Sequence, residues 1–192
     1  MKFLKFILLI VFTSILTLTL EKMFEPLKII NLAPFIVMDS TRSQIRTNEE
    51  ITGIVIHHDA ILNKENETTE ERISAIAKFH RETRGWHSIA YHYFINSNGE
   101  IYQLNNLNEV APHTENFNRE NIGICLAGNF DFIKPTFRQE CALIELVDRL
   151  QKQFNIKFEN VKRHCDLNQT SCPGKLFEFE QFKKWLKIYS IL

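Results

Sequence analysis

Three side chains that suit a metal ion lie far apart in this sequence of 192 residues, so a fold that uses them together must bring distant segments to one place. His57 ends the apolar run of IVIHHDA, whereas His164 and Cys172 lie eight positions apart in VKRHCDLNQTSCPG. Two imidazoles and one thiolate suit Zn2+, and structural zinc sites usually have a fourth protein ligand, whereas catalytic sites leave a position open for water. These residues therefore predict a hydrolytic zinc site.

The composition is that of one globular domain, with 44% apolar and 24% charged residues. Lys and Arg together number 23, as do Asp and Glu, so the formal net charge is zero. A neutral chain lacks the basic surface that attracts nucleic acid or anionic lipid. We expect no nucleic-acid partner and a monomeric protein.

The first twenty residues differ from the rest. Lys2 and Lys5 precede a stretch without charge from Phe6 to Leu20, which is typical of a signal peptide. The stretch is shorter than the ~20 residues that span a bilayer comfortably, and no small-x-small cleavage site follows it. A cleaved signal, an uncleaved signal anchor and a fortuitous apolar start all remain open. We expect an exported protein of the periplasm, the cell envelope or the secreted fraction, with membrane anchoring through residues 1–20 as the alternative.

Apolar and turn patterns predict alternating strands and helices after a linker at residues 21–45, in a domain that covers residues 46–192. Strands are predicted at 51–56, 90–95, 100–104, 122–126 and 160–163, the second and third joined by an Asn98–Gly99 turn. Capping boxes at Thr68 and Thr136 begin two helices, and a third covers residues 177–189 with Phe182, Trp185, Leu186 and Tyr189 facing inward. The pattern predicts an α/β fold with a mixed, mostly β sheet flanked by helices on both faces.

This order puts His57 and His164 just past the ends of two strands and Tyr91 on a third. Cys172 follows on an irregular loop, where Pro173 and Gly174 allow a sharp turn. Sheet edges of this kind bring distant residues together on rigid supports.

The four cysteines do not form an evident disulfide framework for so large a domain. Cys125, in an apolar strand, and Cys141, on a predicted helix, are interpreted as buried small hydrophobes. Cys165 remains ambiguous, and only Cys172 is interpreted as a metal ligand.

Hydrolysis of an amide also needs a hydrogen-bond donor near the developing oxyanion. Tyr91, in SIAYHYFI, is the side chain we expect in this role, and Thr170 could donate from the other side. Structural alternatives remain open for both: a core aromatic for Tyr91 and a hydroxyl that caps nearby backbone for Thr170. His58, His80 and His92 are interpreted as ordinary structural or surface histidines.

Four sequence blocks resemble one known family. IVIHHDA, GWHSIAYHYFINSNGEIYQ, HTENFNRENIGICLAGNFD and HCDLNQTSCPG occur in order over about residues 50–178 and are similar to the type 2 zinc N-acetylmuramoyl-L-alanine amidases. These include phage lysozyme-like amidases and peptidoglycan recognition proteins. The resemblance implies zinc ligands at His57, His164 and Cys172, a catalytic tyrosine at Tyr91 and a substrate-groove histidine at His113. Thr170 follows the recognition-protein variant, since the phage enzymes have Lys there.

The resemblance also implies a fold, a central, mostly β sheet flanked by helices with zinc in an open groove. The reaction it implies is cleavage of the amide between N-acetylmuramic acid and L-alanine in peptidoglycan. Family members without this activity typically lose the cysteine ligand, which is present here as Cys172. A module that binds peptidoglycan or muropeptides without cutting them is the alternative function, with a phage-derived endolysin as a third possibility.

Overall fold

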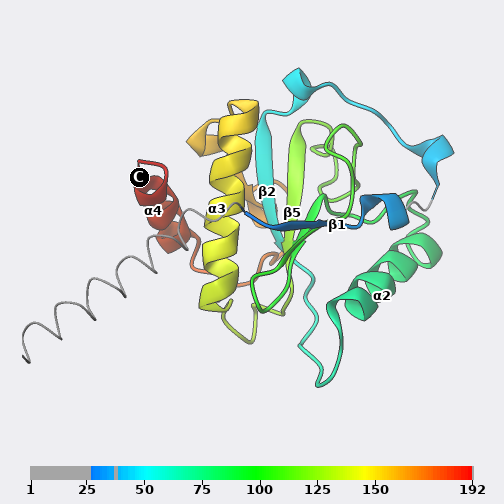
Figure 1. Cartoon of the computed structure of the whole chain (residues 1–192), viewed down its shortest axis with the longest axis horizontal. Coiled ribbons are helices and arrows are strands. Elements are labelled where there is room, and N and C mark those ends of the chain that lie inside the picture. The colour runs from blue at the N-terminus through cyan, green and yellow to red at the C-terminus, as the bar shows by residue number, and fades with distance from the viewer. Residues whose placement is uncertain (1–26, 37–38, 192) are drawn as a thin grey trace, which may run out of the picture.

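The computed structural model of the protein describes residues 27–36 and 39–191, so the predicted signal segment at 1–20 lies outside the described residues. Within them, six strands form one mixed sheet, and three α-helices pack on it (Figure 1). The strands are β1 Ile29–Asn31, β2 Gly53–His58, β3 Tyr93–Ile95, β4 Ile101–Gln103, β5 Asn121–Leu126 and β6 Val161–Arg163. The helices are α2 Thr69–Glu82, α3 Phe137–Phe154 and α4 Phe179–Tyr189.

The strands lie in the order β1-β4-β3-β5-β2-β6 across the sheet. The β3–β4 hairpin is antiparallel, and the other neighbouring pairs run parallel. Strands β2 and β5 are buried along their whole length, as parallel strands covered on both faces must be. The α/β class and the mixed sheet predicted from the sequence are confirmed.

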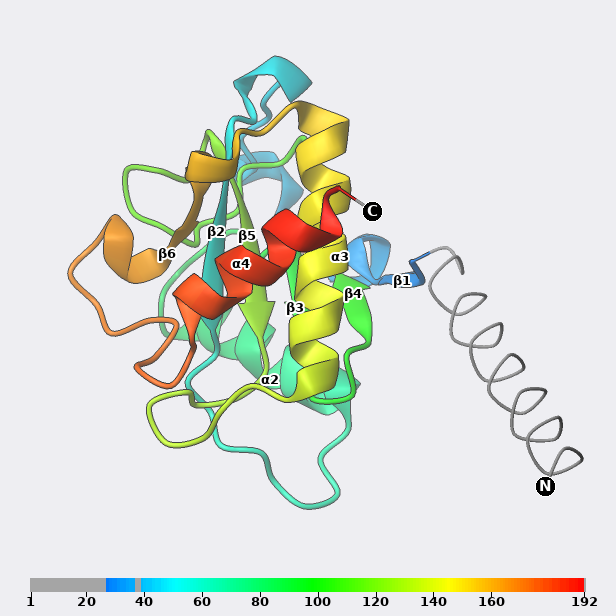
Figure 2. The ribbon, with the colours of Figure 1, turned by 90° about the vertical axis from the view of Figure 1, so that its left-hand side faces the viewer.

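Helices cover both faces of the sheet. Helices α3 and α4 pack on one face, and α2 lies across the other (Figure 2). The larger core joins α3 and α4 to side chains from β2 and β5, including Ile54, Ile56, Ile122, Ile124, Leu143, Leu146, Val147, Leu150, Phe182 and Leu186. Among the helices that the structure describes, none is long and apolar enough to cross a membrane.

The side of the sheet that faces α2 also carries the candidate site. Neighbouring side chains of a strand point to opposite faces, so His57 lies opposite the face that Ile56 shares with α3. In the sheet register His57 pairs with Cys125, which packs in the same core cluster as Ile73 and Ile76 of α2. His57 therefore points to the α2 side, where loops from later in the chain also converge.

Local sequence signals determine where the helices begin. Thr68 and Thr136 accept hydrogen bonds from the backbone N–H of Glu71 and Gln139, whose side chains return the contact. Both predicted capping boxes are thus confirmed. The predicted hairpin also forms, and Gly99 takes the positive φ of 82° that its turn requires.

The structure corrects several sequence expectations. Tyr91 lies before β3, not on a strand, and His57 lies within β2, not past its end. Trp185, expected to face inward, is 52% exposed, and Cys141, expected to be buried, is exposed. Strand β1, which pairs with β4, lies in a segment where no strand was predicted, because three residues are too few to show a period.

Candidate metal centre

The three predicted metal ligands meet at one point of the structure. One ligand atom from each of His57, His164 and Cys172 lies within 4.8 Å of the other two. His57 comes from β2, and His164 begins the short 3-10 helix η5 (His164–Asp166) that directly follows β6. Because β2 and β6 are parallel neighbours, their carboxyl ends bring these histidines together, with ring centroids 4.6 Å apart.

Cys172 reaches this point on a loop that the backbone holds closed. The backbone N–H of Cys165 donates to the carbonyl oxygen of Cys172 at 2.9 Å, which brings the two ends of the loop together. The Cys172 sulfur accepts a hydrogen bond from the backbone N–H of His58 at 3.4 Å, and Cys172 as a whole is only 8% exposed. The thiol is thereby directed at β2.

The donor set fits zinc. The Sγ atom of Cys172 lies 3.7 Å from Nδ1 of His57. Tetrahedral zinc with bonds of about 2.3 Å to sulfur and about 2.0 Å to nitrogen separates two such ligands by roughly 3.6 Å. Two imidazoles and one thiolate also leave one tetrahedral position without a protein ligand, as in catalytic zinc sites.

Burial sets the protonation of the ligands. Burial, with His113 and His164 close by, lowers the pKa of His57 well below 6.5, so its imidazole is neutral and carries a free lone pair. Burial lowers the pKa of His164 as well. The same effect raises the pKa of the Cys172 thiol to about 12, so the metal-free protein holds a protonated thiol whose proton a metal ion would displace.

Tyr91 lies beside this cluster. Its ring centroid is 5.4 Å from that of His57 and 6.0 Å from that of His80. Burial raises the pKa of the Tyr91 phenol well above 10, so the hydroxyl keeps its proton at neutral pH. Tyr91 is therefore a hydrogen-bond donor next to the predicted metal ligands.

Thr170 and His113, the other two predicted site residues, occupy different environments. Thr170 is exposed, and its hydroxyl oxygen accepts from the backbone N–H of Cys172 at 3.2 Å. His113 is only 6% exposed and lies behind His57, with its Nδ1 3.2 Å from Nε2 of His57. Burial lowers the pKa of His113 to about 3, so its imidazole is neutral.

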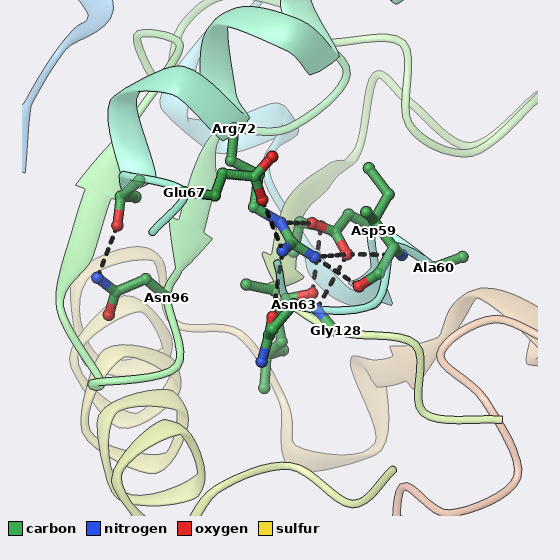
Figure 3. A network of polar contacts seen from close by, with 12 residues as sticks. Asp59, Ala60, Asn63, Glu67, Arg72, Asn96 and Gly128 are labelled. Atoms are coloured by element: carbon green, nitrogen blue, oxygen red, sulfur yellow. Dashed lines mark hydrogen bonds and ion pairs between the residues drawn. The ribbon is translucent and has the colours of Figure 1, made fainter. Parts of the chain in front are cut away.

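A buried ion pair supports the chain directly after β2. Arg72 of α2 donates from Nε to Oδ2 of Asp59 at 2.6 Å and from Nη2 to Oδ1 at 2.9 Å. Figure 3 shows both side chains between the helix and the loop, where Gly128 also donates to Asp59. Because the side chains are only 6% and 2% exposed, this pair ties the helix to the segment that begins at His57.

Sequence reasoning missed this ion pair and the residues around His113. Arg72 lies four residues before Ile76 and eight before His80, which places it on the buried face of α2. A single charged residue on an otherwise apolar helix face is the sequence signal that could have revealed the ion pair. Gly123 interrupts the apolar strand β5, and a glycine there is a mark of close approach by another group. A β-carbon at Gly123 would lie 2.6 Å from Cγ of His113.

The fold and the cluster together define an α/β protein with two histidines and one cysteine that could hold a metal ion at the carboxyl ends of parallel strands. Residues 47–175 match the family model described as N-acetylmuramoyl-L-alanine amidase. The chain belongs to this family, and the resemblance found in the sequence is confirmed.

Solved structures of relatives share the fold over most of the chain. The N-acetylmuramoyl-L-alanine amidase LysC from Clostridium intestinale is 33% identical, with a TM-score of 0.69 over 85% of this chain and 99% of that one. Peptidoglycan recognition protein LE, in a complex with tracheal cytotoxin, a monomeric diaminopimelic acid-type peptidoglycan, is 27% identical. Its TM-score is 0.71 over 82% of this chain and 93% of that one.

Curated relatives come from both branches of the superfamily. The Drosophila melanogaster peptidoglycan-recognition protein LE is 31% identical over 140 residues, which make up 72% of this chain and 40% of that protein. The endolysin of Escherichia phage T7 is 29% identical over 90 residues, 47% of this chain and 56% of the endolysin. The chain spans about half the length of the curated relatives it matches.

Proposed function

We propose that the protein is a zinc-dependent amidase that hydrolyses the bond between N-acetylmuramic acid and L-alanine in peptidoglycan. The main support for this proposal is the convergence of His57, His164 and Cys172, whose ligand atoms lie within 4.8 Å of one another. Membership of the amidase family supports the same assignment. When bound, zinc supplies Lewis-acid activation of water and of the scissile carbonyl.

The residues around the cluster have distinct roles in this proposal. His57, His164 and Cys172 hold the metal, and the phenol of Tyr91 donates a hydrogen bond to the carbonyl oxygen as negative charge develops there. The high pKa of Tyr91 keeps that proton available at neutral pH. Thr170 has a second role: its oxygen accepts from the Cys172 N–H, and its own proton remains free to donate toward substrate.

The substrate class follows from the relatives. One of them, recognition protein LE, was solved with a monomeric peptidoglycan, and two others are N-acetylmuramoyl-L-alanine amidases, one of them an endolysin. We infer that this chain acts on peptidoglycan or on muropeptides released from it. Export to the periplasm, the cell envelope or the medium, which the sequence of residues 1–20 predicts, would bring the protein to this substrate.

A second function is favoured by the similarity to recognition proteins, namely binding of muropeptides without cleavage. The two functions differ in their need for the metal and for Tyr91. An amidase depends on both for turnover, whereas a recognition module requires the binding groove alone.

Mass spectrometry of muropeptides after incubation with the protein tests the proposal. The amidase releases a free stem peptide that begins with L-alanine, together with a glycan that has lost it, and this release stops with a zinc chelator and returns when zinc is added. Binding of the muropeptide with unchanged mass, with and without zinc, would assign the chain to the recognition function. The same spectra also identify the stem peptide that is preferred.

A further inference from the structure

The side chain of His113 is buried between the sheet and the candidate metal centre. Its residue is 6% exposed, and the ring packs on Gly123 of β5, where a β-carbon would lie 2.6 Å from Cγ and 3.0 Å from Nδ1. The Asn118 side-chain oxygen accepts from the backbone N–H of both His113 and Thr114, at 2.9 and 2.6 Å. Both the ring and its backbone are therefore held in one position.

Hydrogen bonding determines which nitrogen of His113 carries the proton. Nε2 lies 3.2 Å from the carbonyl oxygen of Asn121, which only accepts. A neutral His113 therefore has its proton on Nε2 and a bare lone pair on Nδ1. That lone pair faces Nε2 of His57 at 3.2 Å and the Thr114 hydroxyl at 2.8 Å.

The proton of His57 follows from this arrangement. If His57 Nε2 were also bare, two lone pairs would face each other across 3.2 Å without a proton between them. With a proton on Nε2, His57 donates to His113. The Thr114 hydroxyl, 2.8 Å from Nδ1 of His113 and 3.4 Å from Nε2 of His57, can donate to His113 while its oxygen accepts from His57. The neutral ring then has its free lone pair on Nδ1, the atom 3.7 Å from the Cys172 sulfur.

We propose that His113 is a positioning residue, which holds His57 in the tautomer and orientation that present Nδ1 to the metal. The inference rests on the proposed zinc site and adds the element that prepares it, a hydrogen-bonded chain from the Asn121 carbonyl through His113 to His57. Metal-binding histidines typically donate their other N–H to such a partner, which fixes the ring. In this assignment His113 acts through His57 and makes no contact with substrate.

The second predicted histidine ligand, His164, also has a hydrogen-bond partner that fixes the orientation of its ring. Nε2 of His164 lies 3.2 Å from Oδ1 of Asn168, whose Nδ2 donates to the carbonyl oxygen of Glu115 at 3.3 Å. The orientation of the Asn168 amide is thus fixed, and its oxygen accepts from His164. Glu115 lies two residues after His113, so the same segment supports both histidines of the site.

Zinc affinity of the full chain, measured by competition with a chelating dye, tests the role of His113. His113→Phe keeps the ring shape and removes both nitrogens, so we expect zinc affinity to fall by about 10- to 100-fold. His113→Asn restores an acceptor near the position of Nδ1 and should recover most of the affinity. The control His80→Gln changes another buried histidine of the same side of the sheet and should bind zinc as the unaltered chain does.

Two results would overturn the role of His113 as acceptor. One is unchanged zinc affinity in His113→Phe, and the other is an equal loss in His113→Phe and His113→Asn, which would mean that packing alone matters. If His113→Phe does not fold, Gly123→Ala tests the same contact, since the added carbon displaces the imidazole while all polar groups remain. Unchanged affinity in that variant would also count against the proposal.

Nitrogen-15 NMR of the zinc-loaded, unaltered protein gives an independent test. We expect the His57 proton on Nε2 and the metal on Nδ1, and the opposite arrangement would contradict the proposal directly. Neither measurement uses substrate. A protein with the expected tautomer and zinc affinity that leaves muropeptides intact would contradict the amidase function alone, whereas an active amidase with the opposite tautomer would contradict the role of His113 alone.

Discussion

Nδ1 of His57 lies 3.7 Å from the Sγ atom of Cys172, although 115 positions separate the two residues in the sequence. Two separate segments of the chain bring these atoms together. Strand β2 carries the imidazole, and the loop closed by the Cys165–Cys172 backbone hydrogen bond carries the thiol. This distance suits a pair of zinc ligands and makes the thiol a direct test of the proposed function.

Cys172→Ser should abolish both stoichiometric zinc binding and amidase turnover, because a neutral hydroxyl is a far poorer zinc ligand than a thiolate. Metal content of the purified protein and release of stem peptide measure the two effects. Cys165→Ser is the matched control, since its backbone contact to Cys172 does not depend on its sulfur. A Cys172→Ser variant that keeps the full rate in excess chelator would refute the metal assignment.

Tyr91→Phe should keep zinc and lose rate. The change removes only the hydroxyl of a ring whose centroid lies 5.4 Å from that of His57. Loss of one donor to a developing oxyanion typically lowers kcat by about 10²- to 10³-fold. Steady-state kinetics on a soluble muropeptide, together with metal content, check the prediction. Equal zinc content and an equal rate in the variant would remove Tyr91 from the mechanism.

Arg72→Met should destabilise the fold by about 3–5 kcal/mol, because it leaves the Asp59 carboxylate buried without its charge partner. Urea unfolding of the zinc-free protein measures the free energy of unfolding. The control Arg119→Met breaks a pair with Glu50 in which the Arg119 side chain is 51% exposed, and it should cost about 1 kcal/mol or less. An equal loss of unfolding free energy in the two variants would show that the buried Arg72–Asp59 pair contributes no more to stability than an exposed pair.

Much of the fold could be predicted because several signals are local. The two capping boxes depend on residues three positions apart, and the β3–β4 hairpin depends on the Asn98–Gly99 turn. Helix α4 shows that a local apolar pattern does not decide which side chains are buried. Trp185 fits the apolar pattern of the helix and is nevertheless 52% exposed, because the partners that cover Phe182 and Leu186 do not extend to it. Tertiary packing decides which apolar positions are covered.

The metal cluster could be predicted from the family resemblance, since residue types and block order were enough to select His57, His164 and Cys172. The support around it could not. The contact between His113 and His57 depends on a loop that crosses Gly123, and the sequence contains no periodic signal for that crossing. Such contacts between distant segments are set by the sheet register, which pairs Gly123 with Val55, and not by local pattern.

Acid should destabilise the zinc-free protein through its buried histidines, and His80 offers the cleanest test. Burial, aided by the nearby Arg84 charge, lowers the pKa of His80 to about 4, and its Nδ1 accepts from the backbone N–H of Ala90. Above the ordinary value of about 6.5 neither the native nor the unfolded chain is protonated there, so His80 adds no pH dependence. As the pH falls from 6.5 to 4, only the unfolded chain gains the proton, and stability falls by about 3 kcal/mol. Below pH 4 both states are protonated, and this loss ends.

The variant His80→Gln isolates that effect, because glutamine can accept from Ala90 N–H but does not titrate. Urea unfolding with chelator present, at pH 7 and at pH 4, gives the free energy of unfolding of both chains. His80→Gln should be the less stable protein at pH 7, since it loses the packing of the ring on Trp86, and this disadvantage should shrink or reverse at pH 4. A stability difference that stays constant between the two pH values would mean that His80 takes up its proton equally well in the native and unfolded states, contrary to its burial.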